Sequence, residues 1–428
     1  MTTTIDPRRR EGPPLPGSPP LSHQTPLVLV VFFAVYAGMA LGRWPWLRVD
    51  RTGIALLGGI VLFTAGAATG AEMTAAIDVP TLVVLFGLMV LSAQFAACGF
   101  YDWCSARIAA TAASPTVVLA LTVAVGGTLS AVLANDVVVF AMTPMLIAGL
   151  IRRGLDPKPY LIALAGAANA GSAATVIGNP QNILIGQVGG LDFWDFVAVC
   201  GPPAVFGLAA VFAVVWLVWR RRLECTAAAE VIPPPELDRP GLAKAVLATA
   251  ALLMLFATRL SHVSGVLIVA GVLLISRRLA TREILGLVDW PLLVLFGGLF
   301  VVTDALARTG LAADAVAALV GVGIDPGAMS SLLPLTLIGS NTIGNVPAVL
   351  LLLAVLPDLG ADSLYALAVL STLAGNLLVV GSLANIIVVE RAKQAGVVLS
   401  FAEHARCGVP MTVVSMAAAA LWLVLLTA

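Results

Sequence analysis

The sequence predicts an all-α membrane protein with about ten transmembrane helices and two re-entrant hairpins, arranged as two inverted repeats. Composition is the first reason: 60% of the 428 residues are hydrophobic and 11% are charged, so most of the chain must face lipid or the interior of a helix bundle. The second reason is an internal repeat, in which Gly, Pro, Ser and Asn interrupt apolar segments at matching places. We therefore expect a multi-pass protein of the cytoplasmic (inner) membrane, surrounded by the lipid bilayer.

The repeat can be followed at three marks along the chain. The first two recur at an offset of 210 residues and the third at an offset of 203, so the second copy is seven residues shorter near its end. The paired marks are Leu85-Phe86-Gly87 with Leu295-Phe296-Gly297, Ser130 and Asn135 with Ser340 and Asn345, and Gly178–Asn182 with Gly381–Asn385.

Ten apolar segments have about the length that a spanning helix requires. Two further apolar stretches, 115–151 and 328–357, are interrupted near their middles by polar residues. This interruption predicts re-entrant hairpins, whose tips are tolerated only where protein encloses them or where they line a cavity. The ten predicted spans are 27–42, 53–69, 80–98, 159–187, 194–219, 242–257, 263–276, 290–307, 363–390 and 409–427.

The chain divides into a tail, two repeats and a linker. Residues 1–26 are rich in proline and are expected to form a disordered tail. The first repeat is predicted over 27–219 and the second over 242–428, joined by a cytoplasmic linker at 220–241. With the linker inside the cell, eighteen Lys and Arg side chains fall inside and five outside, as the positive-inside rule requires. The two hairpins then enter from opposite sides of the membrane, so the repeats are inverted.

The clearest candidate site is the helix break at 178–182, where Gly178, Asn179, Gln181 and Asn182 surround Pro180. Proline lacks an amide hydrogen and clashes with the preceding turn, so a helix that enters at 159 should break here. The freed backbone groups need partners in lipid, and a bound ion or substrate can supply them. The alternative is a tolerated kink.

The matching break at 381–385 lacks the proline, so it is inferred from the repeat alignment. Its candidate ligands are Gly381, Ser382 and Asn385.

The hairpin tips supply the other candidate ligands. The second tip places Ser340, Asn341, Thr342 and Asn345 within six positions, while the first tip has Ser130, Asn135 and Asp136. Neutral oxygens suit a dehydrated sodium ion, and amide nitrogens with helix N-termini suit an anion. Sodium is the one metal or cofactor that we consider, and the predicted ligands are Ser340, Asn341, Gly381 and Asn385. The alternative is that Thr342 or Asn345 only caps the second limb.

Asp136 is a carboxylate expected at membrane depth, where such a group is costly and by default suggests a function. Two interpretations stay open for it. The side chain either carries a proton or binds a cation, or it caps the helical limb 137–151.

Composition also excludes other classes of protein. The formal net charge is zero, and no basic face exists for nucleic acid. The five cysteines form no CxxC pair, and the three histidines lie outside the repeated motifs. An enzyme would need a clustered base, nucleophile or metal, which the sequence does not offer. A non-transporting receptor would not need paired helix breaks. We therefore expect neither an enzyme nor a receptor.

The motifs resemble the ion transporter superfamily, which includes divalent anion/sodium symporters, arsenite permeases and one group of sodium/proton antiporters. Ser340-Asn341-Thr342 is similar to the tip motif of the dicarboxylate carriers, and Ile177–Asn182 is similar to the break of arsenite-permease-like members. The first tip departs from this pattern, because it has Ser130-Ala131-Val132 where a dicarboxylate carrier would repeat Ser-Asn-Thr. A smaller inorganic anion or an arsenite-like species is thus at least as well supported as a dicarboxylate.

The resemblance implies an elevator-type carrier that forms a homodimer. Together with the paired breaks, it predicts a secondary active transporter that moves a small anion or oxyanion, coupled to a sodium or proton gradient. The alternative is a sodium/proton antiporter in which Asp136 is the exchanging group.

Overall fold

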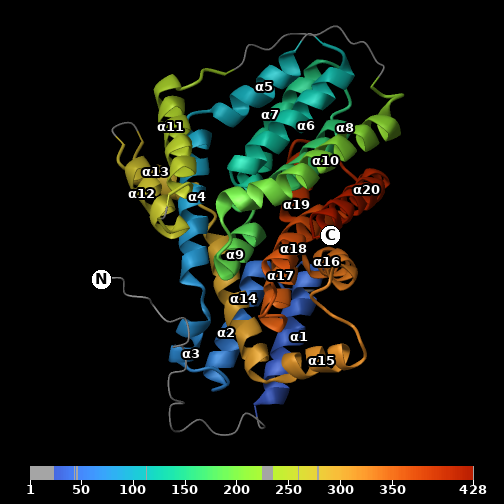
Figure 1. Ribbon diagram of the computed structural model, residues 1–428. Helices are drawn as coiled ribbons and strands as arrows, with labels where there is room; N and C mark the ends of the chain where they lie inside the picture. The colour runs from blue at the N-terminus through green and yellow to red at the C-terminus, as the bar shows by residue number, and fades with distance from the viewer. Residues whose placement is uncertain are drawn as a thin grey trace.

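The computed structural model describes residues 24–42, 44, 47–111, 113–223, 235–258, 260–276 and 279–427. This described part of the chain is built from helices and contains no strand, so the predicted all-α class is confirmed (Figure 1). The predicted tail lies outside the described residues up to residue 23, and α1 begins at Thr25, inside its predicted end. Residues 224–234 of the predicted linker also lie outside the described part.

The order of helices in the first half recurs in the second. The first half contains α1 Thr25–Leu41, α2 Arg51–Thr64, α3 Gly70–Ala76, α4 Val79–Ala97, α5 Phe100–Ala110, α6 Pro115–Val132, α7 Asn135–Arg152, α8 Lys158–Ser172, α9 Pro180–Gly189 and α10 Phe193–Trp219. The second half contains α11 Arg239–Phe256, α12 His262–Leu274, α13 Thr281–Gly286, α14 Trp290–Arg308, α15 Leu311–Gly321, α16 Met329–Ile343, α17 Asn345–Val355, α18 Ala361–Ala374, the 3-10 helix η2 Val379–Gly381, α19 Leu383–Gln394 and α20 Phe401–Thr427.

Each predicted span falls on a helix or on a pair of half-helices. In the described residues, seven helices are long and apolar enough to cross a membrane, namely α4, α6, α7, α10, α11, α14 and α20. The predicted spans 159–187 and 363–390 are each divided, into α8 with α9 and into α18 with α19. The short helices α3, α5, α13 and α15 were not predicted, because none of them is long enough to register as a span.

Local sequence signals explain where several helices begin. Aspartates cap α2, α4, α10 and α14 by accepting backbone N–H groups, and Pro follows closely in α4 and α14, where a missing amide hydrogen costs no bond. At α3, the hydroxyl of Thr69 and the carboxylate of Glu72 cap each other's backbone. The first hairpin stretch is interrupted at residues 133–134 and the second at Gly344, whose φ of 95° favours glycine.

The two halves pack against each other in a matched way. Helices α11, α12 and α13 lie along α4, and α1 and α2 lie along α14 (Figure 1). Small residues allow these close approaches, as is usual between membrane helices. A Cβ at Gly87 would collide with the side chain of Val266, and a Cβ at Gly298 would lie 2.6 Å from the carbonyl carbon of Ala55.

These contacts correct the sequence alignment of the first mark. Both Gly87 with Gly298 and Ala55 with Val266 are 211 residues apart, whereas the sequence pairs Gly87 with Gly297 at 210. A Cβ at Gly297 would meet no atom within 4 Å. Because Gly297 and Gly298 are adjacent, the alignment of the two repeats was ambiguous by one residue. Helix packing shows that Gly298 is the counterpart of Gly87.

Gly298→Ala should therefore destabilise the protein, whereas Gly297→Ala should not. The added methyl group of Gly298→Ala meets backbone atoms of α2, which cannot rotate away, so we expect a loss of about 1–3 kcal/mol. Thermal unfolding of both variants in detergent measures the difference. Equal melting temperatures for the two variants would contradict the packing of α2 on α14.

Candidate functional site

Two unwound segments interrupt the helices at the centre of the molecule. Residues 173–179 separate α8 from α9, and residues 375–382 separate α18 from α19, with η2 inside the second segment. Both begin before the ranges expected from the sequence, 178–182 and 381–385. Pro180 is the first residue of α9 rather than the point of breakage, because a helix tolerates proline at its first position.

An asparagine at the same place in each repeat pairs the carbonyl groups that the break frees. Asn182 Nδ2 donates to the carbonyl oxygens of Ser172 (3.2 Å) and Thr175 (3.0 Å). Asn385 Nδ2 donates to those of Gly375 (2.7 Å) and Leu378 (3.1 Å). The asparagine and its two carbonyl partners in the first repeat each lie 203 residues before their counterparts in the second, which is the offset read from the sequence. These two amides therefore maintain the breaks, as buried carbonyl groups require.

Each repeat also supplies the side chain that binds the asparagine of the other repeat. Asn169 on α8 donates to Asn385 Oδ1 (3.1 Å) and accepts from Ser382 Oγ (2.7 Å). Its counterpart 203 residues later, Thr372 on α18, accepts from Asn179 Nδ2 (3.2 Å) and donates to Asn182 Oδ1 (3.4 Å). All of these side chains are buried.

Two further side chains, Gln181 and Asn376, join these hydrogen bonds between the repeats. Gln181 Nε2 also donates to Thr372 Oγ1 (3.2 Å), and Asn169 Nδ2 donates to Asn376 Oδ1 (2.8 Å). Asn169, Thr372 and Asn376 were not among the site residues predicted from the sequence. Their signal was available, because Asn169 and Thr372 are polar residues in apolar segments at the repeat offset.

The hairpin tips are docked on the breaks of their own repeats. At the first tip, Thr175 Oγ1 donates to the carbonyl of Ala131 (2.5 Å), and the backbone N–H of Asn135 donates to the carbonyl of Gly178 (3.2 Å). At the second, Asn341 Nδ2 donates to the carbonyl of Ala374 (2.9 Å). Gly178 and Gly381 permit this docking, because a Cβ on either would collide with neighbouring polar atoms.

The structure brings together the residues expected to bind sodium, but their amide oxygens already have partners. Asn341 Oδ1 accepts from the backbone N–H of Leu378 (3.1 Å), and Asn385 Oδ1 accepts from Asn169. Ser340 Oγ donates to the carbonyl of Ser371 (3.3 Å). A sodium ion at this position would have to share amide oxygens that each already accept a hydrogen bond.

Two capping interpretations are wrong. Helix α17 has Gly344 at its N-cap and no side-chain cap, and Asn345 Oδ1 instead accepts from the adjacent N–H of Val346 (3.0 Å). Thr342 is exposed and bonds only to carbonyls of its own helix.

At the first tip, Ala134 is the N-cap of α7 and Asp136 lies in the first turn, so Asp136 is not a cap.

Asp136 instead lines a cavity of about 510 Å³ between α4, α5, α7, α9, α14 and α19. The first turns of α7 and α9 border this cavity, through Ala134, Asp136 and Val137 in one and Asn179, Pro180 and Ile183 in the other. Its charged lining consists of Asp102, Asp136, Asp289 and Arg391. A second cavity of about 630 Å³ shares Asp289 and contains Arg51 and Glu390.

The first tip also leaves two buried polar atoms without a partner in the described structure, Ser130 Oγ and Asn135 Oδ1. Such atoms are uncommon and often mark a binding site. The carboxylates around the cavity do not gather into a cluster that could hold a metal, as far as the described residues show. Burial raises the pKa of Asp289 and of Asp102, which favours their neutral forms.

Comparisons with known proteins agree with this architecture. A family model described as citrate transporter matches residues 27–366. An uncharacterized transporter of Mycobacterium tuberculosis is 29% identical over 93% of this chain and 97% of that protein. The silicon efflux transporter of rice is 26% identical over 86% of this chain and 91% of that protein. A putative transporter, arsB, of Dictyostelium discoideum is 23% identical over 86% of each chain.

The fold is also found in a solved structure. The crystal structure of the Alcanivorax borkumensis YdaH transporter superposes with a TM-score of 0.55, covering 95% of this chain and 98% of that one. Its sequence identity is 15%, so the likeness concerns the fold alone.

Asn182→Ala and Asn385→Ala should each lower stability by about 1–3 kcal/mol, because each removes two buried hydrogen bonds to carbonyl groups of a break. Thr342→Ala is the matched control and should leave stability unchanged, since Thr342 is exposed. Thermal unfolding in detergent distinguishes the two groups. If both asparagine variants melt with the wild-type protein, the amides do not maintain the breaks.

Proposed function

This chain belongs to the citrate transporter family, and we propose that it is a secondary active transporter that moves a small oxyanion across the cytoplasmic membrane. The observation that carries the proposal is the cavity bordered by the first turns of α7 and α9. The helix dipole makes such N-termini favourable for an anion, although the N–H groups of Asn135 and Asn182 already donate to Gly178 and to the side chain of Asn179. The name of the rice relative, a silicon efflux transporter, supports a small inorganic substrate.

Charge balance in the cavity supports coupling to a cation. Three carboxylates and one guanidinium line it, so an anion would enter a site that is already negative if all groups were ionised. Protonation of Asp136 would remove one of these charges as the anion binds. A proton suits this role because a titratable carboxylate, Asp136, lines the cavity itself, whereas the amide oxygens considered for sodium lie in the second break and each accept a hydrogen bond.

The hairpins support an elevator-type motion. We propose that α6–α7 and α16–α17 enter from opposite membrane faces and move with the breaks, because their tips are hydrogen-bonded to them. Gly99 and Gly310, with φ of 74° and 77°, precede α5 and α15 at positions 211 residues apart. Glycines in this conformation suit hinges between the moving and stationary helices. A homodimer would provide the stationary part.

The alternative is a sodium/proton antiporter with Asp136 as the exchanging group. The three carboxylates of the same cavity would favour it, whereas the guanidinium of Arg391 there would repel a cation. The two functions differ in whether an anion crosses the membrane.

Uptake into vesicles containing the purified protein tests the proposal. We expect one of arsenite, sulfate, phosphate, citrate or a dicarboxylate to accumulate when a proton gradient is imposed, with a parallel sodium gradient as the comparison. Sodium/proton exchange without movement of any anion would instead establish the antiporter.

Asp136→Asn should abolish gradient-driven accumulation while substrate exchange at equal concentrations continues. The substitution keeps the size of the side chain and removes the titratable charge. One charge moved through 100 mV is worth about 2.3 kcal/mol, so the accumulation ratio should fall by up to about fiftyfold. Asp195→Asn, at an exposed aspartate on α10, is the matched control and should accumulate normally. Wild-type accumulation by Asp136→Asn would exclude it as the coupling group.

A further inference from the structure

Arg391 is the single cation among the described residues that line the 510 Å³ cavity. It lies in the last turn of α19, so the second repeat contributes it to a cavity bordered by the first hairpin tip. Neither repeat mark nor sequence motif includes it. Because α19 packs against α7, the guanidinium faces the same space as Asp136.

The surroundings of Arg391 hold the side chain in place but leave donors unused. Its guanidinium carbon lies 3.4 Å from the centre of the Phe140 ring, a cation–π contact that fixes the plane of the group. Nη1 donates to Gln394 Oε1 (3.2 Å), and Nε is buried without a hydrogen bond. A buried donor of a charged group without an acceptor is costly, which indicates that a ligand completes the site.

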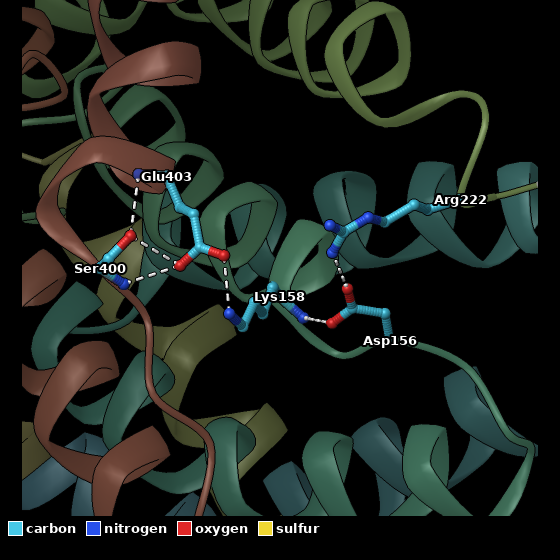
Figure 2. A network of polar contacts seen from close by, with 5 residues as sticks. All are labelled: Asp156, Lys158, Arg222, Ser400 and Glu403. Atoms are coloured by element: carbon cyan, nitrogen blue, oxygen red, sulfur yellow. Dashed lines mark hydrogen bonds and ion pairs between the residues drawn. The ribbon is translucent and has the colours of Figure 1, made fainter.

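Other basic side chains in the described part of the chain form ion pairs that have a structural role. Figure 2 shows Lys158 paired with Glu403 (2.6 Å) and Arg222 paired with Asp156 (2.8 Å), and Glu403 also caps α20 through Ser400. These cations join the ends of α8, α10 and α20. No described carboxylate forms an ion pair with Arg391, although three aspartates line the same cavity.

The repeat makes Arg391 an asymmetric feature. At the offset of 203, its counterpart in the first repeat is Val188, and at the offset of 210 the counterpart of Phe140 is Leu350. The pair that corresponds to Arg391 and Phe140 in the other repeat is therefore apolar. Packing between the half-helix and the hairpin limb does not by itself require an arginine. Arg391 and Asp136 thus line the same cavity, whereas the cation of the second cavity, Arg51, comes from a different helix, α2.

We propose that Arg391 binds the transported anion directly and restricts the substrate to oxyanions that offer two oxygens to one guanidinium. Carboxylates and tetrahedral oxyanions both have this geometry, and a lysine cannot reproduce the paired donors. The Phe140 ring presents the guanidinium, and the first turns of α7 and α9 bind the remaining oxygens. This inference rests on the proposed transport of an anion and names the residue that pairs with its charge.

Transport kinetics of the full-length protein test the inference. Arg391→Lys should raise KM for the anion by about tenfold or more while keeping most of the maximal rate, and Arg391→Gln should lose anion uptake. Arg406→Gln, at an exposed arginine of α20, is the matched control and should leave KM unchanged. Phe140→Leu should raise KM only modestly. If Phe140→Leu reproduced the loss seen in Arg391→Gln, or if Arg391→Lys kept the wild-type KM, Arg391 would serve packing alone.

A second measurement does not depend on transport. Phenylglyoxal modifies accessible arginines, and mass spectrometry of the wild-type protein gives the rate of modification of Arg391. Phosphate, sulfate, citrate or a dicarboxylate should slow this rate severalfold without changing the rate at Arg406. Protection without uptake would contradict the proposed transport and retain the anion site. Uptake of an anion that gives no protection would overturn the role of Arg391 and retain the proposed transport.

Discussion

The fold depends on a constraint that the membrane imposes on unwound backbone. Where a helix breaks inside lipid, each freed carbonyl and N–H group must find a partner within the protein. Here one buried asparagine in each repeat binds the freed carbonyls, and a side chain of the opposite repeat binds that asparagine. Neither break is complete without the other half of the chain. The two repeats therefore stabilise each other at the point where they are least regular.

The neutral polar groups and the charged groups have different places in this arrangement. The amides of Asn169, Asn182 and Asn385 are consumed in holding the breaks, and the hairpin tips are fastened to the same segments. The charged groups lie beside the breaks, in the cavity that contains Asp136 and Arg391. A rigid neutral framework with a charged cavity next to it is a suitable arrangement for a transporter, because the framework can move without losing its own hydrogen bonds.

Much of this architecture could be predicted because membrane helices have a strong sequence signal. Hydrophobic length located the spans, and the offset of 203 paired Asn182 with Asn385 correctly. The partners of these residues could not be predicted, since Thr372 contacts Asn182 across 190 residues of chain. The register of Gly298 required helix packing, and the start of α7 directly after Ala134 depends on backbone geometry that composition does not reveal.

The same limit explains why Arg391 escaped notice. A basic residue near the end of a membrane helix ordinarily lies at the cytoplasmic interface, so its position alone suggests solvation. Only the contact with Phe140 and the shared cavity show that it faces the first hairpin. A structure determined by electron cryomicroscopy in a lipid nanodisc with the transported anion bound would test the account most directly. We expect the anion beside Asp136, Asn179 and Arg391; an anion bound against Arg51 in the second cavity would contradict it.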